Sequence, residues 1–530
     1  MTSPSDSPKR KATGEVGRSA LLVAAGIFLS RISGLIRDRT FSHYLGLSDA
    51  ADAFRAALKI PNFLQTLFGE GVLSASFIPV YAKLLAEEKR EDAGRVAGAI
   101  FSILALVTSL IVAGGILVTP IIMPLLAPGF TGEKRELTIR LIRILFPGVG
   151  LLVLSAWCLG ILNSHRRFFL SYVSPVIWNA AIVTVLIYFG SRVDQSSLVV
   201  HAAWASVVGS GLQFLIQLPV VLKLVPNLRV AFQTANRNVR IVLGNFIPVF
   251  VSRGVVQVSA YVDTTLASLL PTGAVSSLSY AQTLYLLPVS LFGMSVSVAE
   301  LPAMSSALGS HDEVAAVIRQ RIASSIRRIG FFVIPSAVAF LALGDIVAGA
   351  IYITGRFTQS DAVFVWGILA GSAVGLVAQT TGRLYSSGYY ALRDTRTPLR
   401  FAVVRVVLTT GMGYLFAVPL PKLLGIDASW GVAGLTSSAG IAAWVEFLLL
   451  RRGMNRRIGT VEFPTVVLGK LWLSAMIGAA VAWGLRLALH PHQPQIAAIV
   501  ILVPYGLVYL GMTMVFGIDE ARGLLRRVIK

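Results

Sequence analysis

Long apolar stretches separated by short polar segments run along almost the whole chain. A helix that crosses a bilayer needs about 20 predominantly apolar residues, and fourteen stretches reach that length. The pattern therefore predicts an all-α, polytopic membrane protein with about fourteen transmembrane helices. Their expected bounds are 20–46, 53–82, 97–122, 139–162, 168–190, 198–222, 241–269, 275–306, 329–354, 362–389, 399–420, 428–450, 467–489 and 494–517.

A weak internal repeat relates the two halves of this pattern at an offset of roughly 224 residues. In order, 38–42 resembles 263–267, 67–69 resembles 291–293, and 78–79 resembles 301–302. Because the offset spans six helices, an even number, the two copies would share one topology and be related by an axis along the membrane normal. We therefore expect two related six-helix lobes followed by two C-terminal helices.

The repeat and the apolar stretches together predict a domain organisation. The expected parts are a cytoplasmic N-terminal tail (1–19), an N-lobe with helices one to six (20–226), a cytoplasmic linker (227–240), a C-lobe with helices seven to twelve (241–452), helices thirteen and fourteen (453–520) and a cytoplasmic tail (521–530).

Basic residues indicate the orientation of these helices. They gather in the polar segments that an even number of helices places on the same side as both termini. Cytoplasmic loops are enriched in lysine and arginine, so both termini are predicted to be cytoplasmic. The charges that begin at Arg31 are too many for a signal-peptide core, which favours an uncleaved first helix. The few basic residues expected outside are Lys134, Arg135, Arg192, Arg356, Lys422 and Arg486.

Composition narrows the function to transport. Hydrophobic residues make up 55% of the 530 residues and charged residues 13%, which excludes an ordinary soluble protein. The net charge of +21 resides mainly in the basic loops, so no nucleic-acid partner is predicted. The single cysteine, Cys158, excludes an intramolecular disulfide. The only Gly-Lys pair, Gly469-Lys470, has no phosphate-loop context. We expect a transporter, not an enzyme, with no cofactor and no metal site.

Charged residues inside the apolar stretches are the candidates for function. An ionisable group in the membrane is costly and by default faces a wet cavity. Arg31, Lys59 and Glu70 lie deep, with cavity lining and structural ion pairing as the two interpretations. On one continuous helix Asp52, Lys59 and Glu70 would share a face, because each residue turns the helix by about 100°.

Other intramembrane charges have less specific interpretations. Arg37, Asp38 and Asp52 are expected near the outer ends of helices one and two, as gate charges or interfacial residues. Arg31 and Asp38 are seven residues apart and would share a face of the first helix. Glu300, Arg405 and Glu446 are isolated and are interpreted as packing or pairing residues. A cationic cavity implies an anionic, phosphate-bearing amphiphile as substrate.

At these same residues the sequence resembles the MurJ (MviN) family of lipid II flippases, in the multidrug/oligosaccharidyl-lipid/polysaccharide exporter superfamily. The N-terminal motif residues lie in 30–38, 52–54, 59–62, 68–71 and 77–79, and a second block covers 388–398. Helix number, repeat and length agree as well, so the resemblance covers essentially the whole chain. By position, Arg31, Arg37, Asp38, Asp52, Lys59, Asn62 and Glu70 match family motif residues.

The resemblance implies a function, a substrate and a location. Lipid II, the undecaprenyl-pyrophosphate-linked peptidoglycan precursor, would pass from the inner to the outer leaflet of a bacterial cytoplasmic membrane by alternating access. The two six-helix lobes would enclose a cationic cavity with Arg31, Lys59, Asn62 and Glu70 as substrate-binding residues. The last two helices would form a groove for the lipid tail. Membrane potential or an ion gradient would drive transport, and the coupling ion stays open. Membrane lipids and peptidoglycan synthesis proteins are the implied partners.

The sequence departs from the family at two central cations. The family carries arginine where this chain has Gln65, and again where it has Thr283. Arg55 and Arg253 are the candidate compensating cations. Two alternatives therefore stay open. One is an exporter of another polyprenyl-linked saccharide or of a small molecule, and the other is a membrane-embedded glycosyl or phospho-sugar transferase.

Overall fold

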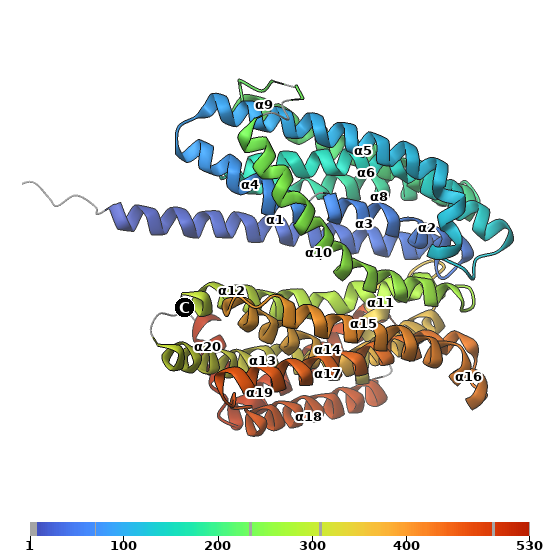
Figure 1. The fold of residues 1–530 in the computed structure, drawn as a ribbon. Coiled ribbons are helices and arrows are strands. Elements are labelled where there is room, and N and C mark those ends of the chain that lie inside the picture. Colours follow the sequence, from blue (N-terminus) through green and yellow to red (C-terminus); the bar gives the residue numbers. More distant parts are fainter. Residues whose placement is uncertain are drawn as a thin grey trace, which may run out of the picture. The chain divides into compact units, whose positions relative to one another are not determined.

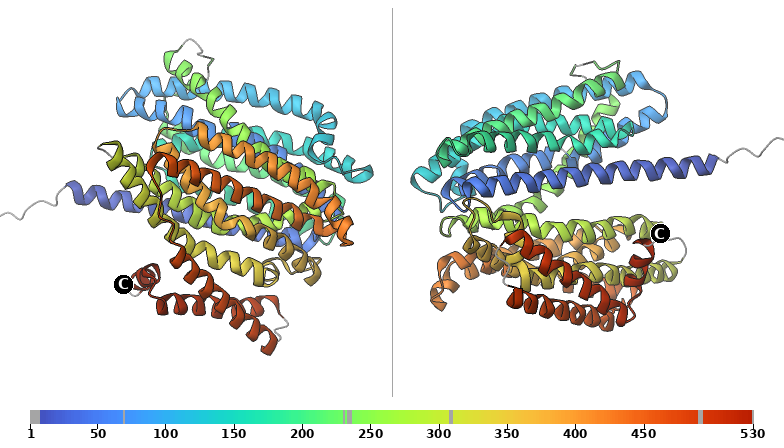
Figure 2. Two further views of the ribbon diagram at one scale, coloured as in Figure 1. Left: turned by 60° about the horizontal axis from the view of Figure 1, so that its bottom comes forward. Right: turned by 180° about the vertical axis from the view of Figure 1, so that it is seen from behind.

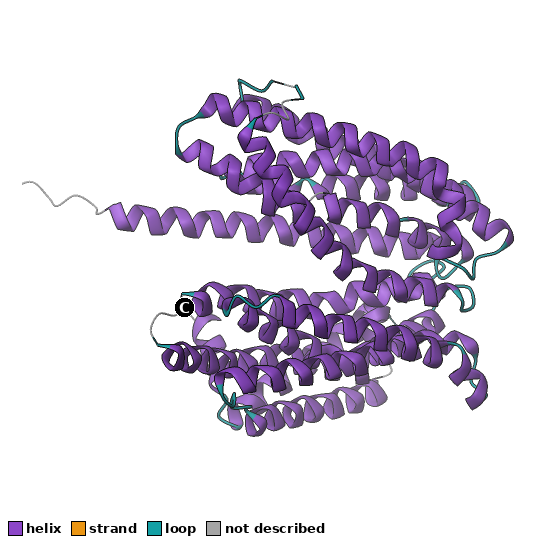
Figure 3. Cartoon of the chain, in the orientation of Figure 1, coloured by secondary structure: helices purple, strands orange, loops and turns teal. Residues whose placement is uncertain are grey.

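A computed structural model describes residues 8–68, 70–229, 231–232, 236–306, 310–489 and 493–528. Within these ranges the side chains of 8–24, 70–71, 247–249, 251–260, 311 and 524–528 lie outside the description. The described chain consists of helices and loops, with a single bridge between Thr354 and Phe357 (Figure 3). It divides into two compact units, Met1–Tyr261 and Val262–Lys530, and each is described by itself.

The N-terminal unit is a helical bundle organised around α6. This helix lies against α5 and α9, while α1 lies against α7 and α8 (Figure 1). The indole of Trp157 in α6 is fully buried and donates a hydrogen bond to the carbonyl of Ala97 in α5 at 3.1 Å. The helices are α1 (Pro8–Leu45), α2 (Asp49–Ala57), α3 (Lys59–Phe68), α4 (Glu70–Ala86), α5 (Arg90–Leu126), α6 (Gly132–Ser164), α7 (Phe168–Val173), α8 (Pro175–Phe189), α9 (Gln195–Leu224) and α10 (Arg237–Ser268).

The C-terminal unit is organised around α14, which lies against α11, α13 and α17. A Cβ on Gly375 of α14 would lie 2.5 Å from the Cα of Gly440 in α17, so glycines let these two backbones meet closely, as in many membrane helix pairs. The pair α18 and α19 packs on α13 (Figures 1 and 2). The elements are α11 (Ala274–Pro288), the π-helix η1 (Val289–Met294), α12 (Ser295–Ser305), α13 (His311–Tyr352), α14 (Gln359–Ala391), α15 (Arg396–Ala417), α16 (Pro419–Leu424), the 3₁₀ turn η2 (Ala428–Trp430), α17 (Gly431–Ile458), α18 (Thr465–Leu489), α19 (Pro494–Val515) and α20 (Asp519–Val528).

Twelve helical segments of the described residues are long and apolar enough to cross a membrane. The prediction of an all-α, polytopic membrane protein is therefore confirmed. The helices α1 and α10 are not among the twelve, although they contain 38 and 32 residues. A count of fourteen transmembrane helices requires that α1 and α10 also cross the membrane, and this count stays a prediction.

The predicted second span, 53–82, is not one continuous helix. Pro61 has no N–H with which to bond the carbonyl of Ala57 four residues earlier, so α2 ends there and α3 starts at Lys59. In the second half of the chain, the repeat segment 291–293 lies in the π-helix η1. This copy of the Leu-Phe-Gly segment thus departs from regular α-helix.

The boundary between the two units lies inside α10, later than the predicted linker at 227–240. The aromatic rings of α10 account for this placement. The hydroxyl of Tyr261 donates to the carbonyl of Lys59, and its ring lies edge-on to Phe63 at 5.0 Å. Phe250 also meets Phe68, with ring centroids 5.0 Å apart. The first part of α10 is therefore held by α3.

Candidate functional site

Asp38 is the centre of a buried charge cluster in the N-terminal unit. Its Oδ1 lies 2.9 Å from Nη2 of Arg37 and 3.1 Å from Nη2 of Arg55, and the carboxylate is almost completely buried. Arg37 also donates to Oδ1 of Asn179 at 3.1 Å and lies over the ring of Trp178. One carboxylate thus joins α1 to α2, and Arg37 extends the contact to α8.

A second cluster joins α2 to α6. Nζ of Lys134 lies 2.8 Å from a carboxylate oxygen of Asp49 and 2.8 Å from one of Asp52. Asp52 is 1% exposed, so its charge is neutralised inside the protein. The residues expected as outer-end charges, Arg37, Asp38 and Asp52, are therefore paired. Lys134 was expected only as a basic residue of the outer side, and its pairing could not be predicted because its partners lie more than 80 residues earlier on another helix.

Arg31 differs from these paired residues. It is exposed on its unit, and within the described residues it makes no hydrogen bond or ion pair. Asp38, which shares its face of α1, pairs with Arg37 and Arg55. The alternative that Arg31 neutralises Asp38 is therefore not observed. Arg31 lies 14 residues before Leu45, the last residue of α1, which is about 21 Å along the helix. Its guanidinium is therefore far from the C-terminal end of α1.

Lys59, Asn62 and Gln65 lie along α3. Lys59 and Gln65 are half-buried and Asn62 is exposed. The expected common face with Asp52 assumed a continuous helix, and the break before Lys59 removes that assumption. Asp52 instead packs toward α6 through Lys134.

The remaining predicted site residues have two different outcomes. The side chains of Glu70 and Arg253 lie outside the described part of the structure. Arg55 is described, and its guanidinium is paired with Asp38. Its suggested role as a compensating cation therefore finds no support in this geometry.

The C-terminal unit contains a cluster of intramembrane charges that could not be recognised as a cluster from the sequence. Nη1 of Arg405 lies 3.1 Å from Oε2 of Glu446, which confirms pairing for both. Arg383 of α14 is half-buried and interacts electrostatically with Tyr285, Arg405 and Glu446. Among the described residues it has no hydrogen-bond or ion-pair partner. The cluster thus contains two guanidinium groups and one carboxylate, and it is net positive.

Arg383 belongs to a helix face close to one of the two departures from the family. Tyr285 of α11 lies two residues after Thr283, and its hydroxyl donates to the amide oxygen of Gln379 in α14. Because α11 lies against α14, Arg383 brings a cation to the neighbourhood of α11, where Thr283 carries none. No spacing along the chain could have shown this, since the residues lie on separate helices.

Glu300, the third residue interpreted as paired or packed, is also paired. Its carboxylate lies 3.1 Å from Nη1 of Arg321 and 3.5 Å from Nη1 of Arg328. Both arginines belong to α13, so this carboxylate ties α12 to α13.

The block 388–398 has a structural role at the junction of α14 and α15. The carboxylate of Asp394 accepts hydrogen bonds from the backbone N–H groups of Arg396 and Thr397, both at 3.0 Å. It also lies 2.7 Å from Nη1 of Arg457 in α17. Partial burial opposes ionisation, but the hydrogen bonds from Thr397 and the charge of Arg457 outweigh it and lower the pKa of Asp394. This carboxylate therefore fixes the start of α15 and ties it to α17.

Comparison with known proteins gives a consistent result over nearly the full length. A family model described as "Lipid II flippase MurJ" matches residues 41–503. A probable lipid II flippase MurJ of Rhizobium tropici is 30% identical over 525 residues, covering 94% of each chain. A lipid II flippase MurJ of Burkholderia cenocepacia is 30% identical over 449 residues, covering 83% of this chain and 84% of its own.

Solved structures show the same likeness. A lipid II flippase MurJ in an inward closed conformation superimposes with a TM-score of 0.78 at 26% identity, covering 94% of this chain and 99% of that one. An inward-facing multidrug resistance MATE family transporter of the MOP superfamily superimposes with a TM-score of 0.65 at 16% identity, covering 84% of this chain and 100% of that one. The second likeness shows the shared fold alone.

Proposed function

The chain belongs to the lipid II flippase MurJ family, and we propose that it moves lipid II from the inner to the outer leaflet of a bacterial cytoplasmic membrane. The observation that carries this proposal is the match of residues 41–503 to the family model. The superposition with a MurJ flippase over 94% of the chain supports it. The protein acts as a transporter by alternating access and not as an enzyme.

The distribution of intramembrane charge suits a diphosphate substrate. Carboxylates such as Asp38 and Glu446 are paired with arginine, whereas Arg31 and Arg383 keep unpaired guanidinium groups within the described residues. A guanidinium can hold a phosphate by two parallel hydrogen bonds. Arg31 is therefore the pyrophosphate-binding residue of the proposal, and Arg383 is a separate candidate cation of the C-terminal unit.

Lys59, Asn62 and Glu70 remain proposed substrate-binding residues on the strength of the family motif. Arg37, Asp38 and Asp52 are proposed to hold the ends of α1 and α2 in position, and so to act on the gate through structure. Membrane potential drives the cycle in this proposal, because the substrate headgroup and its binding residues carry net charge.

Rescue of a bacterium depleted of its own lipid II flippase tests the proposed function. The intact chain should restore growth, and Arg31→Ala should fail to do so at a matched membrane level. The control is Arg452→Ala, which removes an exposed arginine near the end of α17 and should rescue as the unchanged chain does. Failure of the unchanged chain despite normal insertion would favour export of another polyprenyl-linked saccharide, with Gln65 and Thr283 as the reason.

A further inference from the structure

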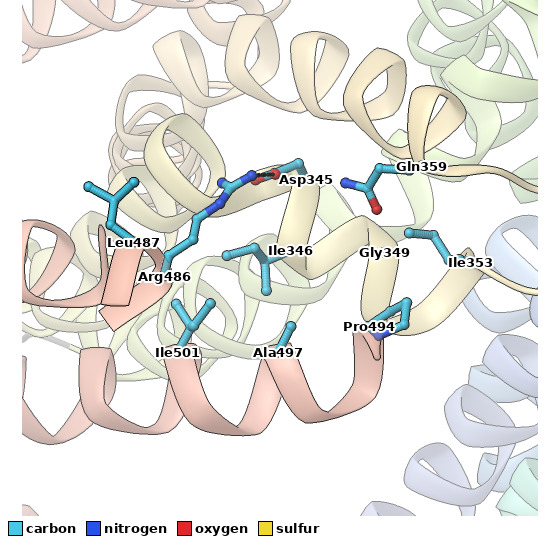
Figure 4. A pocket seen from close by; sticks show the side chains of 10 residues that line it. All are labelled: Asp345, Ile346, Gly349, Ile353, Gln359, Arg486, Leu487, Pro494, Ala497 and Ile501. Carbon is cyan, nitrogen blue, oxygen red and sulfur yellow. Dashed lines mark ion pairs between the residues drawn. The ribbon is translucent and has the colours of Figure 1, made fainter. Parts of the chain in front are cut away.

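A pocket of about 390 Å³ lies in the C-terminal unit among α13, α14, α18 and α19 (Figure 4). At its polar side Oδ2 of Asp345 lies 2.7 Å from Nη2 of Arg486. The amide of Gln359 lies beyond Asp345, while apolar side chains from α13 and α19 form the opposite wall (Figure 4). These walls include Ile346, Ala497 and Ile501.

The wall formed by α13 is fixed by a kink. Leu343 has non-helical backbone angles, φ −133° and ψ 16°. The carbonyls of Leu341 and Ala342 accept hydrogen bonds from the indoles of Trp366 and Trp483, at 2.9 and 3.0 Å. A backbone carbonyl released inside a membrane must find a partner, so the two tryptophans stabilise the kink directly beside Asp345. The pocket is therefore preformed.

The pocket lies near the ends of its helices. Gln359 and Pro494 are the first residues of α14 and α19, and Arg486 is three residues from the end of α18. Asp345 is seven residues before the end of α13, about 10 Å along the helix. Tryptophans are enriched at the level of lipid headgroups, and Trp483 is 43% exposed. The pocket thus lies at headgroup depth, in the outer leaflet according to the proposed topology.

The charges of the pocket favour a zwitterion. The side chain of Asp345 is only 6% exposed, whereas that of Arg486 is 34% exposed. The carboxylate therefore lies at the base and the guanidinium at the mouth. A simple anion would be repelled by Asp345, and a simple cation by Arg486. A ligand with a cationic tip and a phosphate behind it satisfies both groups.

We propose that this pocket binds the headgroup of a zwitterionic phospholipid of the phosphatidylethanolamine type. The ammonium group meets Asp345, the phosphate meets Arg486, and Gln359 supplies a further hydrogen bond. The apolar walls contact the methylene groups between the ammonium and the phosphate. The volume of about 390 Å³ falls within the range of small-ligand pockets, roughly 300–1,000 Å³. The site is independent of the transported substrate, so it stands or falls separately from the proposed function.

The test measures lipid retention by the purified full-length chain with native mass spectrometry. Phosphatidylethanolamine and phosphatidylglycerol are offered at equal concentration. The unchanged chain should retain phosphatidylethanolamine preferentially, and Asp345→Asn or Arg486→Gln should weaken that retention by about tenfold or more, since a charged hydrogen bond is lost. The control Glu300→Gln removes a carboxylate that pairs with Arg321 and Arg328 of α13 and should leave the preference intact.

A charge exchange separates ligand binding from mere stability. Asp345→Arg with Arg486→Asp retains an ion pair but places the cation at the base, where the ammonium group would be repelled. This double variant should keep the thermal stability of the unchanged chain and lose the preference for phosphatidylethanolamine. Equal retention of both lipids by the unchanged chain would overturn the proposal. So would an undiminished preference in the single variants or in the exchanged variant.

Discussion

Individual carboxylates inside this protein are neutralised by arginine side chains that lie next to them. Asp38 is held by two guanidinium groups, and Glu446 by Arg405 at 3.1 Å. The cost of burying a charge is offset only when partners of good geometry are present. Arg31 and Arg383 lack such partners within the described residues, which is why they are the best candidates to meet an anionic substrate.

Sequence reasoning identified the residue types of this site but not their partners. Helical spacing placed Arg31 and Asp38 on one face, yet Asp38 is neutralised by its neighbour Arg37 and by Arg55 of another helix. Arg383 was missed although it is a charged residue inside the predicted span 362–389, because its neighbours on α11 and α17 cannot be read from the sequence. Helical periodicity predicts which residues share a face of one helix. Ion pairs between helices depend on which helices are adjacent, and that is known only from the fold.

Replacement of Arg31 by alanine should remove most of the transport without unfolding the protein. Arg31→Ala should reduce flipping by about tenfold or more, because each hydrogen bond to a charged group contributes about 1.5–3 kcal/mol. Arg31→Lys should keep part of the activity, since the charge remains but the bidentate geometry is lost. Lipid II flipping is measured in cells at matched expression. Full activity of Arg31→Ala, or recovery of activity when Asp38→Asn is added, would show that Arg31 does not bind substrate.

Arg383 and Arg405 should respond differently to the same change. Arg383→Met removes an unpaired charge and should leave the melting temperature unchanged or raised, while transport falls. Arg405→Met leaves Glu446 without its ion-pair partner and should destabilise the protein by roughly 3 kcal/mol. Thermal melting in detergent and a transport assay are performed on both variants. A loss of stability in Arg383→Met that accounts for its loss of transport would remove Arg383 from the site.

At the scale of elements, breaks in helices are as informative as the helices themselves. Hydropathy predicted one span over 53–82, because an apolar run shows length but not continuity of hydrogen bonding. The structure has a break there between Ala57 and Lys59, for which Pro61 is responsible. In the second repeat copy the Leu-Phe-Gly segment at 291–293 lies in a π-helix. The repeat was visible in the sequence, whereas its consequence for the backbone was not.

Asp394 should make the junction of α14, α15 and α17 sensitive to acid. Its pKa is lowered in the folded state, so its contribution is fully present above the ordinary carboxyl pKa of about 4 and is lost as the pH falls through the lowered value. Asp394→Asn should lower the melting temperature at pH 7, and the difference from the unchanged chain should narrow below about pH 4. Glu136→Gln, at an exposed position of α6, serves as the control. A difference that stays constant with pH would contradict this role of the carboxylate.

At the scale of the whole molecule, composition and hydropathy were sufficient for the fold class. Twelve segments of the described residues have membrane-spanning length and apolarity, which confirms the polytopic helical prediction. The boundary between the two units was harder to predict from the sequence. It lies at Tyr261, where an aromatic ring of α10 contacts α3. Those contacts join residues about 200 positions apart in the sequence, so no local sequence pattern could predict them.

The proposed topology can be tested with single cysteines in a Cys158→Ala background. Cys158 is fully buried, so its replacement by alanine removes the only native thiol without leaving a buried hydroxyl. Arg356→Cys and Arg452→Cys lie at exposed positions, in segments expected on opposite sides of the membrane. An impermeant thiol reagent added to intact cells should label the first and not the second. Labelling of both would contradict the proposed arrangement with cytoplasmic termini.

Translocation of labelled lipid II by the purified chain in sealed vesicles is the most direct test of the proposed function. A membrane-impermeant reagent reports how much substrate has reached the outer leaflet, with and without an imposed membrane potential. The account predicts transfer well above that of protein-free vesicles, increased by the potential and mostly lost in vesicles containing Arg31→Ala. Transfer by the unchanged chain no faster than in protein-free vesicles, at normal protein insertion, would contradict it.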